Sequence, residues 1–560
     1  MDLPYICDTD VLVIGQGGAG IKAAVGAAQQ GADVILCGKK QFGKSGATFY
    51  PTLQNYGGVN AITRPDMGDS EEQFLEEILA AADGTVDEKL ARVLVEGSTP
   101  AFRTLENEYE LPFLRDETGN YAAVVCCFGK HERSGSVPMP LFKKSMWRKL
   151  MTTGVRVRGG MDVACLVMKD GRCCGALAID EVGQLVYLRA KATVLCTGGG
   201  CGIYKYSLAT EDLTGDGYIL ALDVGASLVN MEFIQFIPGL TWPVQKFLFQ
   251  QTALGTMPEL KNRDGEDFLQ PYLPEGVTRE ECLVERAKHG PFSTVGAGRY
   301  FDIAMYEQWR SGKAFESGGL LLKYPESIKN DQRHFIKSML SWLEDYGVDS
   351  IHKGFHLIPH AQGFNGGIHI KEDASTGVPG LYAAGEVAGG PHGADRLGGN
   401  ALAASQVFGG IAGISAAKYA AEQDRPEISA EEAYAQLRNR FDNPGGALVD
   451  IEASKKMIRE IMWTDGAICR SAERCAQGLA KIAQIEASFD PMKHLQEGVD
   501  ARGAVSLYSY IQLSKVLLSV MDVRKESRGP HYRLDYPTRD PRFATYISVS
   551  KNGKELAFDY

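Results

Sequence analysis

The 560-residue sequence predicts an α/β fold, built around a Rossmann-like dinucleotide-binding domain with an inserted segment and a helical C-terminal part. Three observations lead to this prediction. A strand, a glycine loop, a helix and a second strand open the chain, and the alternation of strands and helices breaks between about residues 240 and 355. Residues 430–490 then carry helical spacing of apolar and charged side chains. This length suits roughly two to four structural units and leaves room for a large buried cofactor.

The first of these features is a β-loop-α-β unit. Residues 10–14 form a short apolar strand, residues 21–30 an Ala-rich helix and residues 32–37 a second strand. The loop between the first strand and the helix is Gly15-Gln16-Gly17-Gly18-Ala19-Gly20. In such a loop Gly15 allows the tight turn, Gly17 lets the backbone approach a pyrophosphate, and Gly20 lets the helix pack closely on the strand. We therefore predict a bound dinucleotide at the helix N-terminus; the alternative is a glycine loop without a ligand.

The end of the second strand departs from the usual dinucleotide pattern. An acidic residue there normally accepts from the ribose hydroxyls, but this sequence has Gly38. The neighbouring Lys39 does not replace an acceptor. We expect backbone groups or water to form the hydrogen bonds with the ribose hydroxyls instead, or the adenosine end of the ligand to bind less tightly.

The remaining segments complete the predicted organisation. Residues 154–179 form alternating strands with a turn at 169–171, residues 192–196 and 381–385 form further strands, and residues 400–419 form a helix. We divide the chain into a first part of the dinucleotide domain (1–238), an insertion (239–355), a second part of the dinucleotide domain (356–422), and a C-terminal helical domain and tail (423–560).

Composition and charge exclude several classes of function. A net charge of -11 and a pI near 5.5 argue against a nucleic-acid surface. The N-terminus is acidic where a signal peptide is basic, and we found no apolar stretch long enough to span a bilayer, so we expect a cytoplasmic protein. The 12 cysteines show no zinc or iron–sulfur spacing, so we expect no metal site.

Six motifs carry a resemblance to a known family. They are Lys44-Ser-Gly-Ala-Thr48, Thr197-Gly-Gly-Gly200, Thr214-Gly-Asp-Gly217, Gly385-Glu-Val387, His392-Gly-Ala-Asp-Arg-Leu-Gly-Gly-Asn-Ala-Leu402 and Arg524-Lys-Glu-Ser-Arg-Gly-Pro-His531. In content and order they resemble the succinate dehydrogenase/fumarate reductase flavoprotein family, which includes L-aspartate oxidase. The resemblance implies a Rossmann-like FAD-binding domain in two parts, an inserted α+β capping domain over the isoalloxazine, and a C-terminal helical domain.

The resemblance also implies which residues contact FAD. Glu386 would accept from ribitol or ribose hydroxyls, and Asn400 would open a helix whose N–H groups stabilise negative charge on the reduced flavin. Asp216 would contact FAD as well. The alternative is that Asp216 only stabilises a glycine-rich turn and that Asn400 only caps its helix. With the glycine loop, the expected set is Gly15, Gly17, Gly18, Ala19, Gly20, Gly38, Lys39, Ser45, Ala47, Thr48, Gly57, Gly58, Val163, Gly198, Gly199, Asp216, Gly385, Glu386, Arg396, Asn400, Ala401 and Leu402.

Ala47 decides how the flavin is expected to be attached. Many family members bind FAD covalently through a histidine just ahead of a threonine, and here Ala47 precedes Thr48. Because alanine has no nucleophile, we predict non-covalent FAD.

The substrate side differs from the family's dicarboxylate site of two histidines and two arginines. Ile237 and Gln362 stand where the resemblance places the histidines, and residues 254–257 lack one arginine. The last arginine is retained as Arg396. We therefore do not expect fumarate reduction or succinate oxidation.

Arg396 is the best candidate for holding a substrate anion, because a guanidinium binds a carboxylate with two hydrogen bonds. The alternative is an ion pair with Asp395 or a flavin contact. His392, in the same loop, is either near the flavin or structural. Arg299 and Tyr300 of the insertion are further catalytic candidates. Weaker candidates, more often surface or packing residues, are His131, Glu132, Arg133, His356, His360, Cys126 and Cys127.

These features lead to three hypotheses. The first is an FAD-dependent oxidoreductase that moves a hydride between flavin N5 and a small organic acid, an amine-bearing or an unsaturated carboxylate, anchored by Arg396. The second is the flavin subunit of an electron-transfer complex with an iron–sulfur partner, similar to adenylylsulfate reductase or succinate dehydrogenase. The third is a catalytically idle flavoprotein used for binding or regulation.

Overall fold

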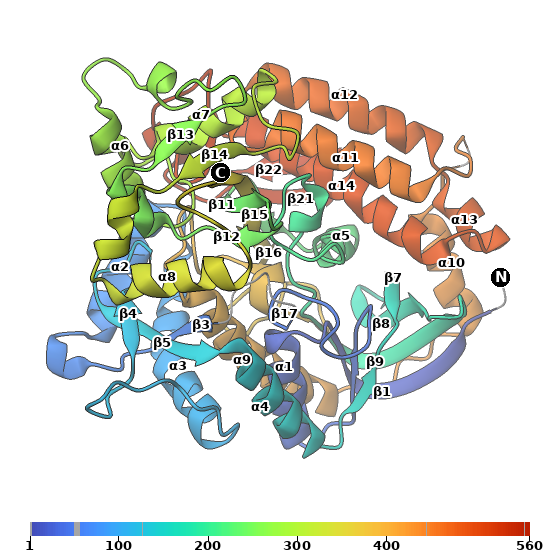
Figure 1. The fold of residues 1–560 in the computed structure, drawn as a ribbon. Helices are drawn as coiled ribbons and strands as arrows, with labels where there is room; N and C mark the ends of the chain where they lie inside the picture. The colour runs from blue at the N-terminus through green and yellow to red at the C-terminus, as the bar shows by residue number, and fades with distance from the viewer. Residues whose placement is uncertain (1–2, 50–55, 126, 444, 554) are drawn as a thin grey trace.

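The computed structural model describes residues 3–49, 56–125, 127–443, 445–553 and 555–560. Its first elements are β1 (Tyr5–Ile14), α1 (Gly18–Gln29) and β2 (Val34–Cys37), which confirm the predicted β-loop-α-β unit (Figure 1). β1 begins at Tyr5 rather than at residue 10 because its first, partly exposed half also pairs with β9 (Leu185–Leu195).

β1 lies inside a seven-stranded sheet with the order β6-β2-β1-β9-β8-β7, and β17 adds to β9. The first four of these strands are parallel, whereas β8 pairs antiparallel with both β7 and β9. The strand predicted at 192–196 is the end of the longer β9. The other bounds are β6 (Arg156–Arg158), β7 (Asp162–Lys169), β8 (Arg172–Ile179) and β17 (Leu381–Ala383).

The glycine loop brings α1 close to the sheet. Gly15 has a φ of 114°, and a side-chain carbon at Gly20 would overlap the carbonyl group of Gly15. Only glycine at both positions allows the helix to start this close to the end of β1. The N-terminus of α1 therefore lies at the carboxyl end of the parallel strands, where ligands bind in such sheets.

The insertion has its own sheet and hydrophobic core. Its sheet order is β12-β11-β15-β14-β13. The predicted boundaries at 238/239 and 355/356 fall inside β11 (Ile234–Trp242) and β15 (Phe355–Phe364), which pair antiparallel over nearly their whole length. These two strands carry the chain from the FAD-binding domain into the insertion and back. The remaining elements are β12 (Phe247–Leu248), β13 (Glu259–Lys261), β14 (Leu320–Lys323), α6 (Arg279–Arg286), α7 (Arg299–Arg310) and α8 (His334–Asp345).

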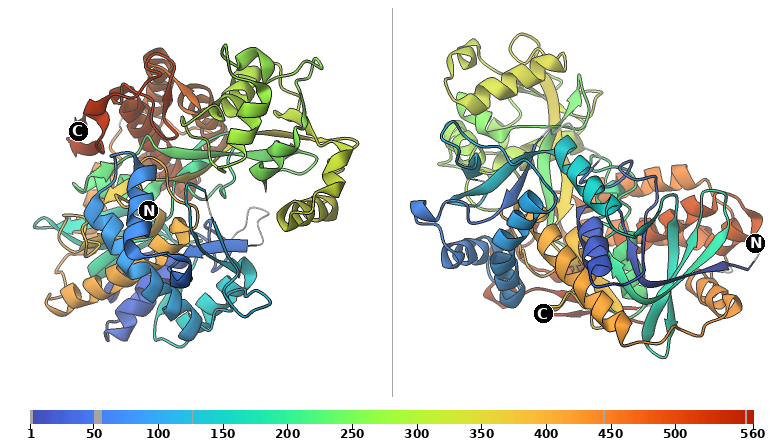
Figure 2. Two further views of the ribbon diagram at one scale, coloured as in Figure 1. Left: turned by 90° about the vertical axis from the view of Figure 1, so that its left-hand side faces the viewer. Right: turned by 90° about the horizontal axis from the view of Figure 1, so that it is seen from below.

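In the left view of Figure 2 the insertion forms the green and yellow lobe, which stands apart from the blue elements of the FAD-binding domain. The other elements of that domain before residue 423 are α2 (Glu71–Ala82), α3 (Glu88–Asn107), α4 (Met139–Met151), α5 (Asp216–Asp223), α9 (Asn400–Ala421), β3 (Tyr56–Asn60), β4 (Ala123–Val125), β5 (Glu132–Pro138), β10 (Leu228–Val229), β16 (Gly367–His369) and β18 (Ala388–Gly389).

The C-terminal region begins with helices and ends in a hairpin. The hairpin of β21 (Ser548–Asn552) and β22 (Glu555–Asp559) adds to β10 in a sheet of order β18-β16-β10-β21-β22, a return of the chain that the sequence did not predict. The other elements are α10 (Ala430–Arg440), α11 (Ile451–Gly466), α12 (Ala472–Ser488), α13 (Pro491–Glu497), α14 (Ala501–Val523), β19 (Cys469–Arg470) and β20 (Tyr532–Arg533).

Helix α14 corrects one expectation from the sequence. By length and composition it is apolar enough to cross a membrane, with a mean hydropathy of 1.3, although the sequence was expected to hold no such stretch. Its polar and charged residues interrupt the apolar run and make it inconspicuous in the sequence. Within the structure 78% of the apolar window is buried, and α14 packs against α11 and α12 (Figure 1).

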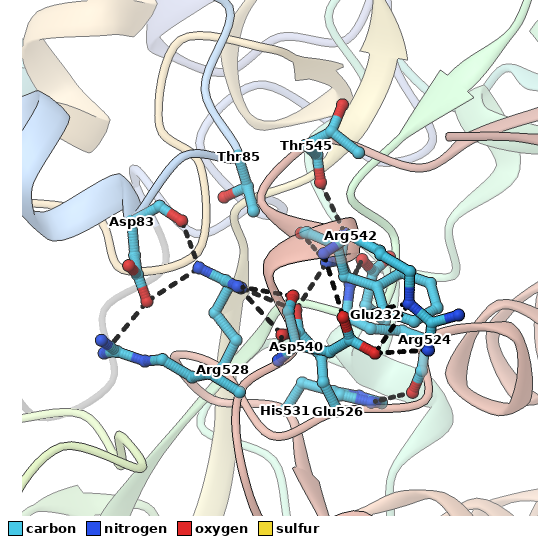
Figure 3. Close-up of polar contacts among 12 residues, drawn as sticks. Asp83, Thr85, Glu232, Arg524, Glu526, Arg528, His531, Asp540, Arg542 and Thr545 are labelled. Atoms are coloured by element: carbon cyan, nitrogen blue, oxygen red, sulfur yellow. Dashed lines mark hydrogen bonds and ion pairs between the residues drawn. The ribbon is translucent and has the colours of Figure 1, made fainter.

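A buried network of charged groups fastens the C-terminal segment to the FAD-binding domain (Figure 3). The Glu526 carboxylate accepts from Arg524 at 2.9 Å and from Arg528 at 2.6 Å. Arg524 also pairs with Glu232 at 2.5 Å, and Arg528 pairs with Asp83 at 3.0 Å. Since Glu232 and Asp83 belong to the first half of the chain, this network joins segments that lie far apart in the sequence.

We predict that Glu526→Leu lowers the free energy of unfolding by about 3–5 kcal/mol, because it leaves Arg524 and Arg528 buried without their shared carboxylate. Urea denaturation measures this change. Glu452→Gln is the control: Glu452 is exposed and pairs with the neighbouring Lys455, so its loss should cost less than about 1 kcal/mol. Equal denaturation midpoints for the two variants would contradict the prediction.

Candidate active site

A large cavity lies where the two parts of the FAD-binding domain meet. It has a volume of about 320 Å³. The first turns of α1, α5 and α9 line it, and each of these helices begins after a glycine whose position offers no side-chain cap (Gly17, Gly215 and Gly399). Helix N-termini without a cap present unpaired N–H groups and the positive end of the helix dipole. The cavity therefore suits a ligand with several anionic or strongly polar groups.

Most of the residues expected to contact the cofactor lie together on this cavity. They are Gly15, Gly17, Gly18, Ala19, Gly38, Lys39, Ser45, Ala47, Thr48, Gly57, Val163, Gly198, Asp216, Gly385, Glu386, Arg396, Ala401 and Leu402. His392, expected near the flavin, lines it as well.

Four residues of the expected set lie outside the cavity lining. Gly20 packs on Gly15, and a side-chain carbon at Gly58 or Gly199 would overlap Ser134 or Glu386, respectively. The Asn400 side chain accepts from Asn60 Nδ2 at 2.6 Å rather than capping α9. These residues shape the cavity from behind instead of lining it.

Lys39 and Asp216 form a partly buried ion pair on the cavity wall. The Lys39 ammonium contacts the Asp216 carboxylate and donates to Thr214 Oγ1 at 2.5 Å. Burial lowers the pKa of Lys39, but Asp216 and the other nearby carboxylates outweigh it, so the pKa is raised overall. The Asp216 carboxylate therefore binds Lys39 in addition to standing at the start of α5.

Glu386 is a partly buried carboxyl group in the second part of the domain. Burial raises its pKa, while the hydrogen bond from the Phe364 amide, at 3.0 Å, and the charge of Arg396 act in the opposite direction. Its carboxyl oxygens are the acceptors that hydroxyl groups of a bound ligand require.

Five buried polar atoms test whether a flavin dinucleotide fits this cavity. Gln16 Oε1, Thr197 Oγ1, Asp212 Oδ1, Gln362 Oε1 and His392 Nδ1 have no hydrogen-bond partner among the described residues, although Asp212 Oδ1 forms an ion pair with Lys40 at 3.7 Å. All five side chains belong to the lining. Buried polar groups are normally paired, so these atoms indicate a polar ligand. The residues present fit FAD. The sequence did not predict contacts by Gln16, Thr197 or Asp212. The available signals were that Gln16 lies in the glycine loop, that Thr197 begins one Thr-Gly motif and that Asp212 lies two residues before another.

Comparison with known proteins agrees with this geometry. Residues 10–402 match the FAD binding domain family, and residues 455–560 match the fumarate reductase flavoprotein C-terminal family. The chain is 31% identical to a subunit of the fumarate reductase (CoM/CoB) of Methanothermobacter marburgensis, over 98% of this chain and 97% of that one.

The chain belongs to the succinate dehydrogenase/fumarate reductase flavoprotein family. It is therefore an FAD-dependent oxidoreductase, as the sequence predicted. Mycobacterium smegmatis Sdh1 in complex with UQ1 is 25% identical and superposes with a TM-score of 0.82, over 99% of this chain and 94% of that one. Escherichia coli quinol fumarate reductase FrdA, 24% identical, has the same fold with a TM-score of 0.82, over 99% of this chain and 97% of that one.

The mode of flavin attachment in this family member depends on Ala47. Its methyl group lines the cavity and offers no nucleophile. We predict that acid precipitation releases all of the flavin into the supernatant and that the denatured polypeptide shows no flavin fluorescence on a gel. A fluorescent polypeptide band would contradict non-covalent binding.

The groups expected to meet the substrate also line the cavity. Arg396 donates to Gln235 Oε1 at 2.8 Å and to the Leu397 carbonyl at 3.2 Å. Burial and the Arg396 charge lower the pKa of His392 to about 3, so its imidazole is neutral at physiological pH. Gln362 lines the same cavity. Together these three residues offer one cation and neutral hydrogen-bonding groups.

An apolar cluster of Leu208, Ile237 and Leu248 adjoins the cavity, and Leu208 and Leu248 line it directly. Ile237 is 5% exposed, so no polar group replaces the histidine that the resemblance implied at this position. Leu254, from the segment without the expected arginine, is buried in the core of the capping domain. Apolar packing around Ile237 and Leu254 thus replaces two polar groups of the dicarboxylate site that the resemblance implied.

The other catalytic candidates lie elsewhere. Arg299 donates to the Thr294 carbonyl and to the Tyr300 hydroxyl, each at 2.9 Å, and neither residue lines the cavity. The structure therefore does not bring Arg299 and Tyr300 to the site.

The weaker candidates have local partners. His131 and Arg133 contact Glu77 in a separate ionic cluster. The Cys127 sulfur accepts from the Gly290 amide at 3.1 Å, whereas Cys126 lies outside the described residues. His360 is buried with its Nδ1 beside the Ile358 carbonyl, and the His356 ring contacts Ser317.

Asp395 connects the loop of Arg396 to the capping domain. Its carboxyl group accepts from the Ser293 hydroxyl at 2.6 Å, and burial raises its pKa to about 7. Because the folded state keeps a proton that the unfolded state loses above its usual pKa near 4, stability should fall as pH rises from about 4 to about 7.

We predict that Asp395→Asn removes this part of the pH dependence, which amounts to at most about 4 kcal/mol. Melting temperatures of wild type and variant between pH 4 and pH 8 measure the effect. The wild type should lose stability relative to the variant toward pH 8, and parallel curves would contradict the raised pKa.

Proposed function

We propose that this flavoprotein moves a hydride between flavin N5 and a carbon atom of a small organic acid that carries one carboxylate and an apolar or amine-bearing body. The substrate is saturated or unsaturated next to that carboxylate, and it is neither fumarate nor succinate. The observation that supports this proposal is the pairing of one guanidinium, Arg396, with the apolar wall of Leu208, Ile237 and Leu248.

Arg396 would hold the substrate carboxylate. Gln235 accepts from one guanidinium nitrogen and fixes the plane of the group. A guanidinium held in this way can bind a carboxylate with two hydrogen bonds and orient the carbon next to it. A second carboxylate would have to lie against the apolar wall, where burial of a charge without a partner is unfavourable.

The remaining groups position the substrate and exclude water. Bound FAD supplies the acceptor or donor of the hydride. Neutral His392 offers Nδ1, which has no partner among the described residues, for a hydrogen bond to the substrate, but its low pKa excludes an imidazolium acid at neutral pH. Leu208 and Leu248 keep water away from the reacting carbon.

Anaerobic screening of the purified protein tests this proposal. Oxidised and dithionite-reduced enzyme are mixed with a library of monocarboxylic, dicarboxylic and amino acids while the visible flavin absorbance is followed. We expect bleaching or reoxidation by monocarboxylates, and response to dicarboxylates alone would overturn the proposal. A flavin that no library member bleaches or reoxidises would instead favour a protein without catalytic turnover.

The second candidate is the flavin subunit of an electron-transfer complex in the cytoplasm. Two observations are compatible with this second candidate. The relative from Methanothermobacter marburgensis is named as one subunit of its enzyme, and the described residues contain no group of three or more potential metal ligands of their own. Affinity purification from the native host tests it: a brown, iron-containing partner supports the complex, and a flavoprotein that stays alone and forms peroxide in air contradicts it.

A further inference from the structure

Gln16, the second residue of the glycine loop, occupies the space beside the end of β2. A side-chain carbon at Gly38 would lie 2.9 Å from Gln16 Cγ and 3.2 Å from its Oε1. The Gln16 side chain is 6% exposed and lines the cavity together with Gly38 and Lys39. It therefore fills the place where a side chain at position 38 would begin.

The orientation of the Gln16 amide is fixed by its surroundings. Nε2 donates to the Arg158 carbonyl at 3.0 Å, and a carbonyl oxygen can only accept, so the other end of the amide is the oxygen. That oxygen, Oε1, is buried and has no partner among the described residues. A buried acceptor without a donor is unfavourable, so a hydroxyl group of a ligand would be bound here.

Neither residue at the end of β2 competes for this role. Gly38 has no side chain, and the Lys39 ammonium, a donor only, is held by Asp216 and Thr214. In Rossmann-type sites an acidic side chain at the end of the second strand accepts from the ribose hydroxyls. We propose that Gln16 Oε1 accepts this hydrogen bond from the adenosine ribose of FAD, so that the glycine loop supplies the acceptor that position 38 lacks.

The test compares two ligands on two proteins. Full-length wild type and Gln16→Ala are stripped of flavin, and Kd is measured by fluorescence for FAD and for an FAD analogue whose adenosine ribose lacks both hydroxyls. We expect wild type to bind the analogue about tenfold more weakly than FAD, the effect of one hydrogen bond. Gln16→Ala should bind the two ligands equally, within about twofold, as the loss of that single bond requires.

Two controls separate this contact from damage to the loop. Gln16→Met keeps a similar side-chain volume without the amide and should lose the discrimination as well, even if Gln16→Ala folds poorly. FMN lacks the adenosine, so its Kd should be the same for wild type and both variants. Two results would overturn the assignment. One is that the variants prefer FAD over the analogue as strongly as wild type does, and the other is that wild type binds both ligands equally.

Discussion

Replacing Arg396 by glutamine should lower kcat/KM by a factor of about 10³ while the protein keeps its FAD. The expected size follows from two charge-assisted hydrogen bonds to a carboxylate, each worth about 1.5–3 kcal/mol. Arg396→Lys should recover little of the loss, because an ammonium cannot form the planar pair of hydrogen bonds. Steady-state kinetics with the acid found by screening, together with the flavin-to-protein ratio, measures both effects.

Arg92→Gln is the matched control for Arg396→Gln. Arg92 is an exposed arginine of α3 that pairs with Glu88 one turn away and does not line the cavity. It should leave kcat/KM unchanged. Full activity in Arg396→Gln would show that Arg396 does not bind the substrate.

The second large effect is expected for Gly17→Ala. Among the described residues, a side-chain carbon at this position would meet only Thr48 Oγ1, at 3.7 Å, so these residues accommodate the methyl group. The methyl group would project at the cavity wall where the backbone has to approach the pyrophosphate. We expect FAD affinity to fall about 100-fold, which corresponds to the upper range for overpacking, about 3 kcal/mol.

The Kd of FAD and the melting temperature of the flavin-free protein test this expectation together. The melting temperature of Gly17→Ala should stay near that of wild type. Gly154→Ala serves as control, because a side-chain carbon there has no atom of the described part of the chain within 4 Å, and the Kd of FAD should not change. Wild-type affinity in Gly17→Ala would place the pyrophosphate elsewhere.

Local patterns were sufficient to predict the FAD-binding domain. The apolar run of β1 and the glycine loop are short-range signals, and the structure confirms them. The C-terminal hairpin was not predicted, because β21 and β22 depend on pairing with β10, more than 300 residues away in the chain. The entry and exit of the insertion also depend on long-range pairing, since β11 and β15 are defined by each other.

The functional site also divides into residues that local motifs predict and residues whose role depends on tertiary contacts. Residues within recognisable motifs, such as Glu386 and Thr48, were predicted and lie on the cavity. Gln16 was missed because the motif allows any residue at its position. Its role becomes visible only in the structure, where its side chain fills the space beside Gly38. Arg299 was a reasonable candidate by residue type, but its partners, Thr294 and Tyr300, lie away from the cavity.

We propose that the part of the cavity around Arg396 binds a substrate with one carboxylate. Difference absorbance of the oxidised flavin, titrated with butanoate and with succinate, tests it most directly, because the two acids have the same chain length and binding does not depend on the direction of the reaction. The structure predicts that butanoate binds at least about tenfold more tightly, since the second carboxylate of succinate would meet Leu208 and Leu248. Tighter binding of succinate would contradict the claim.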